Sequence, residues 1–100
     1  MVNINMIHIS PWSATLALMR GAGAVLPPGG VLYLYGPFQR DHTHTAPSNE
    51  DFDRSLRRMN PEWGVRDLED VTQAANDSGL TRSDVVPMPI NNFSIIFHRR

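Results

Sequence analysis

The first eleven residues after Met1 constrain the fold most, because an apolar run passes directly into a helical pattern. Residues 2–9 are apolar and partly β-branched, which is typical of a buried strand. Ser10 is a favoured helix N-cap and Pro11 a favoured first helical residue, so a helix should begin there. Ligands of open α/β sheets bind at such strand-to-helix junctions, so the polar side chains of this stretch are the first site candidates.

The chain continues with a helix from Pro11 to Val25 and a second buried strand. Residues 27–30, Pro-Pro-Gly-Gly, end the helix, and residues 31–35, Val-Leu-Tyr-Leu-Tyr, have the composition of a strand. Strand, helix and strand predict one right-handed βαβ unit with parallel strands. The helix carries an apolar stripe at helical spacing, formed by Trp12, Leu16, Met19 and Gly23.

Two further helices are predicted after a long polar loop over residues 36–49. The first covers residues 49–59 and is capped by Ser48, with acidic residues in its first turn and arginines in its last. The second is capped by Asp67 and ends at Gly79, which should adopt a left-handed conformation. The expected inward-facing residues are Phe52, Leu56 and Met59 in the first helix and Leu68, Val71 and Ala75 in the second.

The C-terminal end predicts two antiparallel strands, residues 84–88 and 93–98, joined by a hairpin-type connection. Pro87 and Pro89 cannot donate hydrogen bonds to a ladder, so the first of these strands should lie at a sheet edge. The fold class is therefore α/β, with a parallel βαβ unit, two helices and an antiparallel hairpin in a single domain of residues 1–100.

Composition excludes several classes of function. The net charge is −1 and the charges are scattered, so no footprint for nucleic acid or an acidic membrane is present. The sequence has no cysteine and no lysine, which excludes disulfides, thiolate catalysis, cysteine-bound zinc and Schiff-base chemistry. No apolar run is long enough to span a bilayer, and no signal-type pattern opens the chain, so a cytoplasmic location is expected.

Several side chains could serve a site after the predicted strands. His8 could act as a general base, because imidazole titrates near neutral pH, or it could be hydrogen-bonded beneath the following helix. Tyr35 and Phe38 could form aromatic walls for an acceptor, or could pack in the core. Arg66 could pair with an acidic residue or an anionic substrate. The remaining substrate-binding candidates are Arg40, Thr45, Ser48 and Asn49, of which the last three are also explained as cap and turn residues.

The long loop also contains potential metal ligands. Asp41, His42 and His44 could be proposed as ligands in the long loop, but a histidine pair at this spacing without a third strong ligand is weak, so no metal is expected.

The turn over residues 26–32, Leu-Pro-Pro-Gly-Gly-Val-Leu, resembles the turn before the fifth strand of class I S-adenosylmethionine-dependent methyltransferases. Further motifs carry the resemblance in the same order along the chain: Asn5-Met-Ile-His-Ile-Ser-Pro-Trp12, Tyr33-Leu-Tyr-Gly-Pro-Phe38, Thr45-Ala-Pro-Ser-Asn49, Trp63-Gly-Val-Arg-Asp67 and Asn91-Asn92. Together they resemble the methyltransferase-like family of unknown function 938, over essentially the whole chain.

The resemblance covers the second half of that family's Rossmann-like fold. It implies strands four, five, seven and six of the class I sheet, with the last strand antiparallel and inserted beside the fifth. It also implies S-adenosylmethionine as cofactor, a small-molecule acceptor, and Asn5, Ser10 and Trp12 near the cofactor, with Asn5 and His8 in catalysis. The Gly-rich strand-turn-helix of the family does not occur in this sequence, so we expect no activity from this chain alone.

The same resemblance predicts self-association. Without the first three strands of the sheet, the strand over residues 2–9 would be an exposed apolar edge, which is a template for pairing. Two copies could pair these edges antiparallel about a two-fold axis, giving a homodimer. Three functions remain open: a methyltransferase-type protein, a non-catalytic self-associating module, and a metal-assisted hydrolase that uses His8, His42 and His44.

Overall fold

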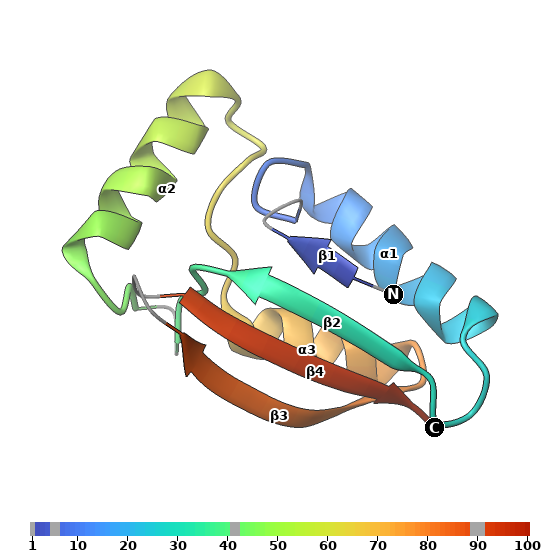
Figure 1. Cartoon of the computed structure of the whole chain (residues 1–100). Helices are drawn as coiled ribbons and strands as arrows, with labels where there is room; N and C mark the ends of the chain where they lie inside the picture. Colours follow the sequence, from blue (N-terminus) through green and yellow to red (C-terminus); the bar gives the residue numbers. More distant parts are fainter. Residues whose placement is uncertain (1, 5–6, 41–42, 89–91) are drawn as a thin grey trace.

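The fold consists of three helices and a four-stranded sheet, seen in a computed structural model that describes residues 2–4, 7–40, 43–88 and 92–100 (Figure 1). The elements in chain order are β1 (Val2–Ile4), α1 (Trp12–Val25), β2 (Val31–Gly36), α2 (Pro47–Met59), α3 (Leu68–Asp77), β3 (Leu80–Met88) and β4 (Asn92–Arg99). The predicted α/β class is therefore confirmed.

The sheet has the strand order β1-β2-β4-β3. β1 pairs with β2 in parallel, whereas β4 is antiparallel both to β2 and to β3. The predicted antiparallel C-terminal pair is confirmed, and so is the edge position of its first strand, which begins earlier than expected, at Leu80. The last strand lies between β2 and β3, as the resemblance implied.

The first strand is shorter than predicted. β1 covers Val2–Ile4, and Ile7 and His8 lie in a turn rather than in the strand. Both side chains are nevertheless buried. Packing against neighbouring segments buries them, since residues 7 and 8 do not pair with another strand. Asn5, a predicted catalytic and cofactor residue, lies outside the described residues.

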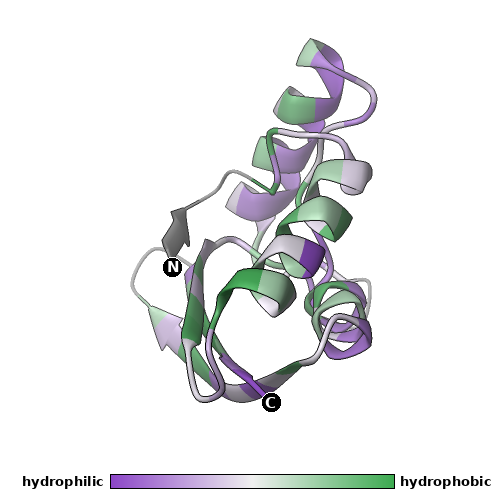
Figure 2. Cartoon of the chain, turned by 90° about the vertical axis from the view of Figure 1, so that its right-hand side faces the viewer, coloured by the Kyte–Doolittle hydropathy of each residue, from purple (hydrophilic) through white to green (hydrophobic). Residues whose placement is uncertain are grey.

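One face of the sheet carries α1 and α3, and the core lies between them and the strands (Figures 1 and 2). Alternation along β2 and β4 places every second side chain on this face, where Leu32, Leu34, Ile95 and Phe97 are fully buried. The opposite face bears Tyr33, whose hydroxyl lies 2.5 Å from Oγ of Ser94. Val31, Val86 and Met88 are apolar strand residues that stay more than a third exposed.

Two predicted helix starts are wrong. Pro11, not Ser10, occupies the N-cap position of α1 and makes no side-chain cap. α2 begins at Pro47 after Ala46, so Ser48 lies inside its first turn and not before it. In α2 the first helical residue is Pro47, which has no N–H group that would need an acceptor at that position. Asp67 does cap α3 as predicted, accepting from the N–H groups of Glu69 and Asp70.

The buried side of α2 also differs from the prediction. Phe52 is 36% exposed and Met59 67% exposed, and only Leu56 of the expected apolar trio is buried. The helix turns Asn49 and Asp53 inward instead, because it packs on a polar segment and not on the sheet. The inward face of α3, formed by Leu68, Val71 and Ala75, is as predicted.

The two helices on the sheet approach closely at their C-terminal ends. A Cβ atom on Gly23 would lie 2.0 Å from the carbonyl oxygen of Ser78, so only glycine fits between α1 and the end of α3. Nε of Arg99 donates to the carbonyl of Gly23 at 2.5 Å and fixes this contact to the end of β4. Gly79 has φ of 88°, as expected for the residue that ends α3.

Candidate functional site at the ends of β1 and β2

His8 is the buried centre of the region that follows β1. Its Nδ1 accepts the N–H of Arg66 at 3.0 Å, and its carbonyl accepts the N–H of Gly64 at 2.9 Å. Phe38 packs on the imidazole edge-to-face, with ring centroids 4.9 Å apart. Nδ1 is an acceptor in this arrangement, so the neutral ring carries its proton on Nε2, an atom without a partner among the described residues.

The environment keeps His8 neutral. The pKa of His8 is lowered from 6.5 to about 4, mainly by burial and secondly by the positive charge of Arg66, against smaller opposing effects of the Gly64 backbone and Asp53. At neutral pH the imidazole is therefore uncharged and its one available lone pair is bound to a backbone N–H. In this state His8 holds the segment around Arg66 in place.

Arg66 ties that segment to the turn after β1. Its Nε donates to the carbonyl of Ile7 at 3.0 Å, and one terminal nitrogen donates to the carbonyls of Ser10 at 2.6 Å and Glu62 at 2.8 Å. Its guanidinium carbon lies 5.7 Å from the ring centroid of Trp12. These donors therefore hold the turn after β1 in place. The Arg66 side chain also lines a neighbouring cleft.

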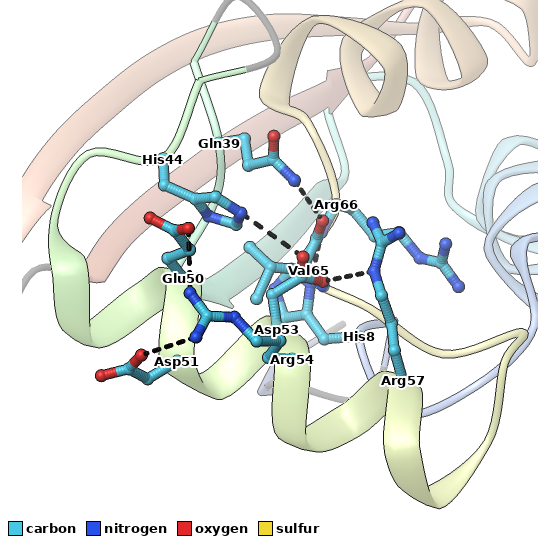
Figure 3. A network of polar contacts seen from close by, with 10 residues as sticks. All are labelled: His8, Gln39, His44, Glu50, Asp51, Asp53, Arg54, Arg57, Val65 and Arg66. Carbon is cyan, nitrogen blue, oxygen red and sulfur yellow. Dashed lines mark hydrogen bonds and ion pairs between the residues drawn. The ribbon is translucent and has the colours of Figure 1, made fainter.

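Asp53 connects α2 to the same segment (Figure 3). Its Oδ1 accepts the N–H of Val65 at 2.9 Å and Nε of Arg57 at 3.1 Å, and its Oδ2 lies 3.4 Å from Nε2 of His44. The carboxylate is nearly buried, so these contacts replace the water that it would otherwise need. A side chain on Gly64 would come within 2.9 Å of Oδ1, which keeps this position small.

A cleft of about 410 Å³ opens beside these residues, between the first turns of α1 and α3. Its lining residues are Trp12, Gln39, Arg57, Val65, Arg66, Asp67 and Asp70. Gln39 is fixed there, because its side chain donates to the carbonyl of Val65 at 3.0 Å and its backbone bonds to the segment as well. The cleft combines two arginines, two aspartates and one indole ring.

The structure brings only some of the sequence candidates together. Trp12 and Arg66 share the cleft, close to His8. Phe38 is buried against His8 and cannot form an open wall. Tyr35 is half-buried, on the other side of the sheet from the fully buried Leu34.

The loop candidates form separate small contacts. The guanidinium of Arg40 lies 5.8 Å from the Phe93 ring centroid, and Asn49 donates to the hydroxyl of Thr45 at 3.2 Å. Ser48 is exposed in the first turn of α2. Of the potential metal ligands in the loop, His44 contacts Asp53, whereas Asp41 and His42 lie outside the described residues. No group of three or more potential metal ligands forms within the described part of the chain.

The sequence analysis did not indicate four polar residues of the site, Gln39, Asp53, Arg57 and Asp70. The spacing of Asp53 and Arg57 is that of an i, i+4 ion pair, which indicates a contact along one helix face but not that the carboxylate is buried. The position of Gln39 depends on the pairing of residues 39 and 67, which lie far apart in sequence.

Strand order, the inserted antiparallel strand and the helix pair on one face define the C-terminal part of the class I S-adenosylmethionine-dependent methyltransferase fold, and solved structures agree. An O-methyltransferase family 2 protein from Planctomyces limnophilus, in complex with apigenin, is similar with a TM-score of 0.87 and 19% identity. The match covers 99% of this chain and 30% of that chain.

Two further structures match the same unit. A putative O-methyltransferase from Nostoc punctiforme has a TM-score of 0.85 at 14% identity, covering 98% of this chain and 30% of that one. The methyltransferase of calicheamicin biosynthesis, bound to S-adenosylhomocysteine, has a TM-score of 0.81 at 12% identity, covering 99% and 29%. This chain therefore spans about a third of the length of the structures that it matches.

The chain belongs to the protein family of unknown function 938, whose model matches residues 1–99. The resemblance noted from the sequence motifs is confirmed by this match. Within the described residues, no helix is both long and apolar enough to cross a membrane.

Proposed function

We propose that this chain is the acceptor-side part of an S-adenosylmethionine-dependent methyltransferase, and that methyl transfer also needs a cofactor-binding part. The observation that supports the proposal is the match of the complete unit, from β1 to β4, to the C-terminal portion of O-methyltransferases. At 19% identity the similarity shows the fold. We propose the methyl-transfer reaction and a small-molecule acceptor in addition.

The described residues fit the cofactor only in part. S-adenosylmethionine supplies an activated methyl group when bound. Of the residues expected near it, Trp12 offers an aromatic face in the cleft, whereas the carbonyl of Ser10 already accepts from Arg66. One aromatic wall does not hold a nucleoside and an amino-acid group together, so we propose that this chain alone does not bind the cofactor.

His8 takes a positioning role in this proposal. Its neutral ring fixes the backbone of Arg66, and Arg66 in turn holds the loop that leads into α1. Its role as a general base stays a prediction and would require the bond from the Arg66 N–H to open first.

Calorimetry with S-adenosylhomocysteine tests the proposal. We expect no binding to this chain alone at millimolar ligand, and binding once the chain is co-expressed with the Gly-rich half of a matching methyltransferase. Micromolar binding by the chain alone would disprove the need for a second part. Failure of the combined halves to bind, although they form a complex, would favour a non-catalytic module.

We also propose that two copies associate through β1. This strand lies at the end of the strand order, next to β2 only, so its outer edge is a site for a further strand in the described sheet. Light scattering should give the mass of a dimer at micromolar concentration, and the β1 amides should be protected from hydrogen exchange. A monomer at all concentrations, or unprotected amides in the dimer, would disprove this interface.

A further inference from the structure

The cleft at the first turns of α1 and α3 has a charge distribution that the proposed methyl transfer does not use. Arg57 and Arg66 line one part of it, and Asp67 and Asp70 line another, with the indole of Trp12 among them. Both charge signs therefore face one small volume, and an aromatic surface lies beside them.

The two arginines retain donors for a ligand. Arg66 uses Nε and one terminal nitrogen on backbone carbonyls, and Arg57 uses Nε on Asp53. Among the described residues, no partner is found for the other terminal nitrogen of Arg66 or for either terminal nitrogen of Arg57. Both arginines line the same part of the cleft, and the charge of Arg57 adds to burial in lowering the pKa of Arg66, so the two cations repel each other there. An anion placed between them would relieve this repulsion.

The acidic side lies at the start of α3. Asp67 is nearly buried and holds the N–H groups of Glu69 and Asp70, so its position is fixed by the helix that it caps. Asp70 is exposed one turn further along. These carboxylates oppose a second negative group on the ligand and favour a cationic one, which argues against a doubly charged phosphate.

An apolar extension continues from this point. A second hollow of about 340 Å³ shares Trp12 and Asp70 with the cleft and runs between α1 and α3. Leu16 and Ala74 supply an apolar part of its lining beside Trp12, and Gln73 and Asp77 supply a polar part. A ligand held at the arginines could therefore lay an apolar or aromatic group along this groove.

We propose that the cleft binds a small zwitterion of the amino-acid type, with its carboxylate between Arg57 and Arg66, its ammonium group toward Asp70, and its apolar side chain against Trp12. Arg57 and Asp70 have no role in the proposed methyl transfer, whereas Trp12 is shared with the expected cofactor side, and all of these residues lie within the described part of the chain.

L-phenylalanine is a suitable probe, with phenylacetate and phenethylamine as controls that lack the ammonium group and the carboxylate respectively. Binding is read from the fluorescence of Trp12 in a Trp63→Phe background and from calorimetry. We expect phenylalanine to bind more tightly than either control. Arg57→Gln should weaken phenylalanine about tenfold, the effect of one charge-assisted hydrogen bond, whereas Arg58→Gln should not.

A second variant avoids the contact between Arg57 and Asp53. Asp70→Asn should weaken phenylalanine and phenethylamine but leave phenylacetate unchanged, and Glu69→Gln in the same turn should change none of them. Absence of phenylalanine binding, equal binding of phenylacetate, or binding unaffected by both Arg57→Gln and Asp70→Asn would overturn the proposal.

Discussion

The helices α2 and α3 are consecutive and similar in length, yet they are held by different forces. α3 lies on the sheet, with Leu68, Val71 and Ala75 fully buried in the core. α2 extends away from the sheet (Figure 1) and buries Leu56 together with the polar Asn49 and Asp53. The comparison indicates that apolar area fixes α3, whereas a buried carboxylate bonded to the neighbouring segment fixes α2.

The segment between the two helices depends on His8. Residues 64–66 donate their backbone N–H groups to Asp53 on one side and to His8 on the other. Loss of the carboxylate should therefore release α2, whereas loss of core packing should unfold the whole domain. The following predictions test this division, from the largest expected effect to the smallest.

Leu68→Ala in α3 should reduce the free energy of unfolding by about 3 kcal/mol, because it removes a fully buried side chain and leaves a cavity. Met59→Ala at the end of α2 is the matched variant and should change it by less than about 0.5 kcal/mol, because Met59 is 67% exposed. Urea denaturation measures both. Equal losses would mean that α2 is also packed on the core.

The contribution of His8 should appear as a pH dependence. Its pKa is about 4 in the folded chain and 6.5 in the unfolded one, so the unfolded state binds more protons between these values. The stability that neutral His8 provides is complete above about pH 6.5 and is lost as pH falls toward 4, by about 3 kcal/mol in total.

The matched variant is His8→Asn, whose side-chain oxygen can still accept the N–H of Arg66 but does not titrate. The difference in free energy of unfolding between the two proteins should shrink on acidification, since the acidic residues contribute equally to both. A difference that stays constant from neutral pH to pH 4 would contradict the burial of a neutral His8.

Asp53→Ala should cost about 2 kcal/mol, because it leaves the N–H of Val65 buried without its acceptor. Hydrogen exchange should show the loss in α2 and residues 64–66, with α3 still protected. Asp51→Ala is the control, since the Asp51 side chain is 75% exposed. Uniform deprotection of both helices would show that α2 and α3 unfold as one unit.

Glu50→Gln should have the smallest effect, below about 0.5 kcal/mol. Oε1 of Glu50 lies 3.0 Å from Nη2 of Arg54 on α2, but both side chains are more than half exposed. A double-mutant cycle with Arg54→Gln measures the pair. A coupling as large as the Asp53→Ala effect would assign the stability of α2 to its surface charges instead of its buried carboxylate.

The contrast between the helices also explains which predictions from sequence were correct. Apolar spacing identified the inner face of α3 because that helix packs on an apolar sheet. Asp67 was correctly predicted as its cap because a cap bonds only to the first turn of its own helix. Apolar spacing gave the wrong inner face for α2, where Phe52 and Met59 are exposed. No local pattern indicates that Asp53 receives an N–H from Val65, twelve residues away.

The site was predictable to a similar extent. The strand-to-helix junction indicated His8 and Trp12 as candidates, and the structure places both in contact with Arg66, while their functional roles stay predictions. The pairing of residues 39 and 67, which shapes the cleft, follows from tertiary contacts that no spacing in the sequence encodes. For the same reason Arg40 and Thr45, which lie close to these residues in the chain, contribute nothing to the cleft lining.

Gly23 gives the helix pair a pivot at the end away from the cleft. α1 and α3 meet where Gly23 faces Ser78, whereas Trp12 and Asp70 line the groove toward the other end of the helices. A larger residue at position 23 would force the helices apart at their contact, and Trp12 lies about 16 Å further along α1. We therefore expect a larger residue at position 23 to change the width of the groove, and with it the affinity for the proposed zwitterion, without contacting the ligand.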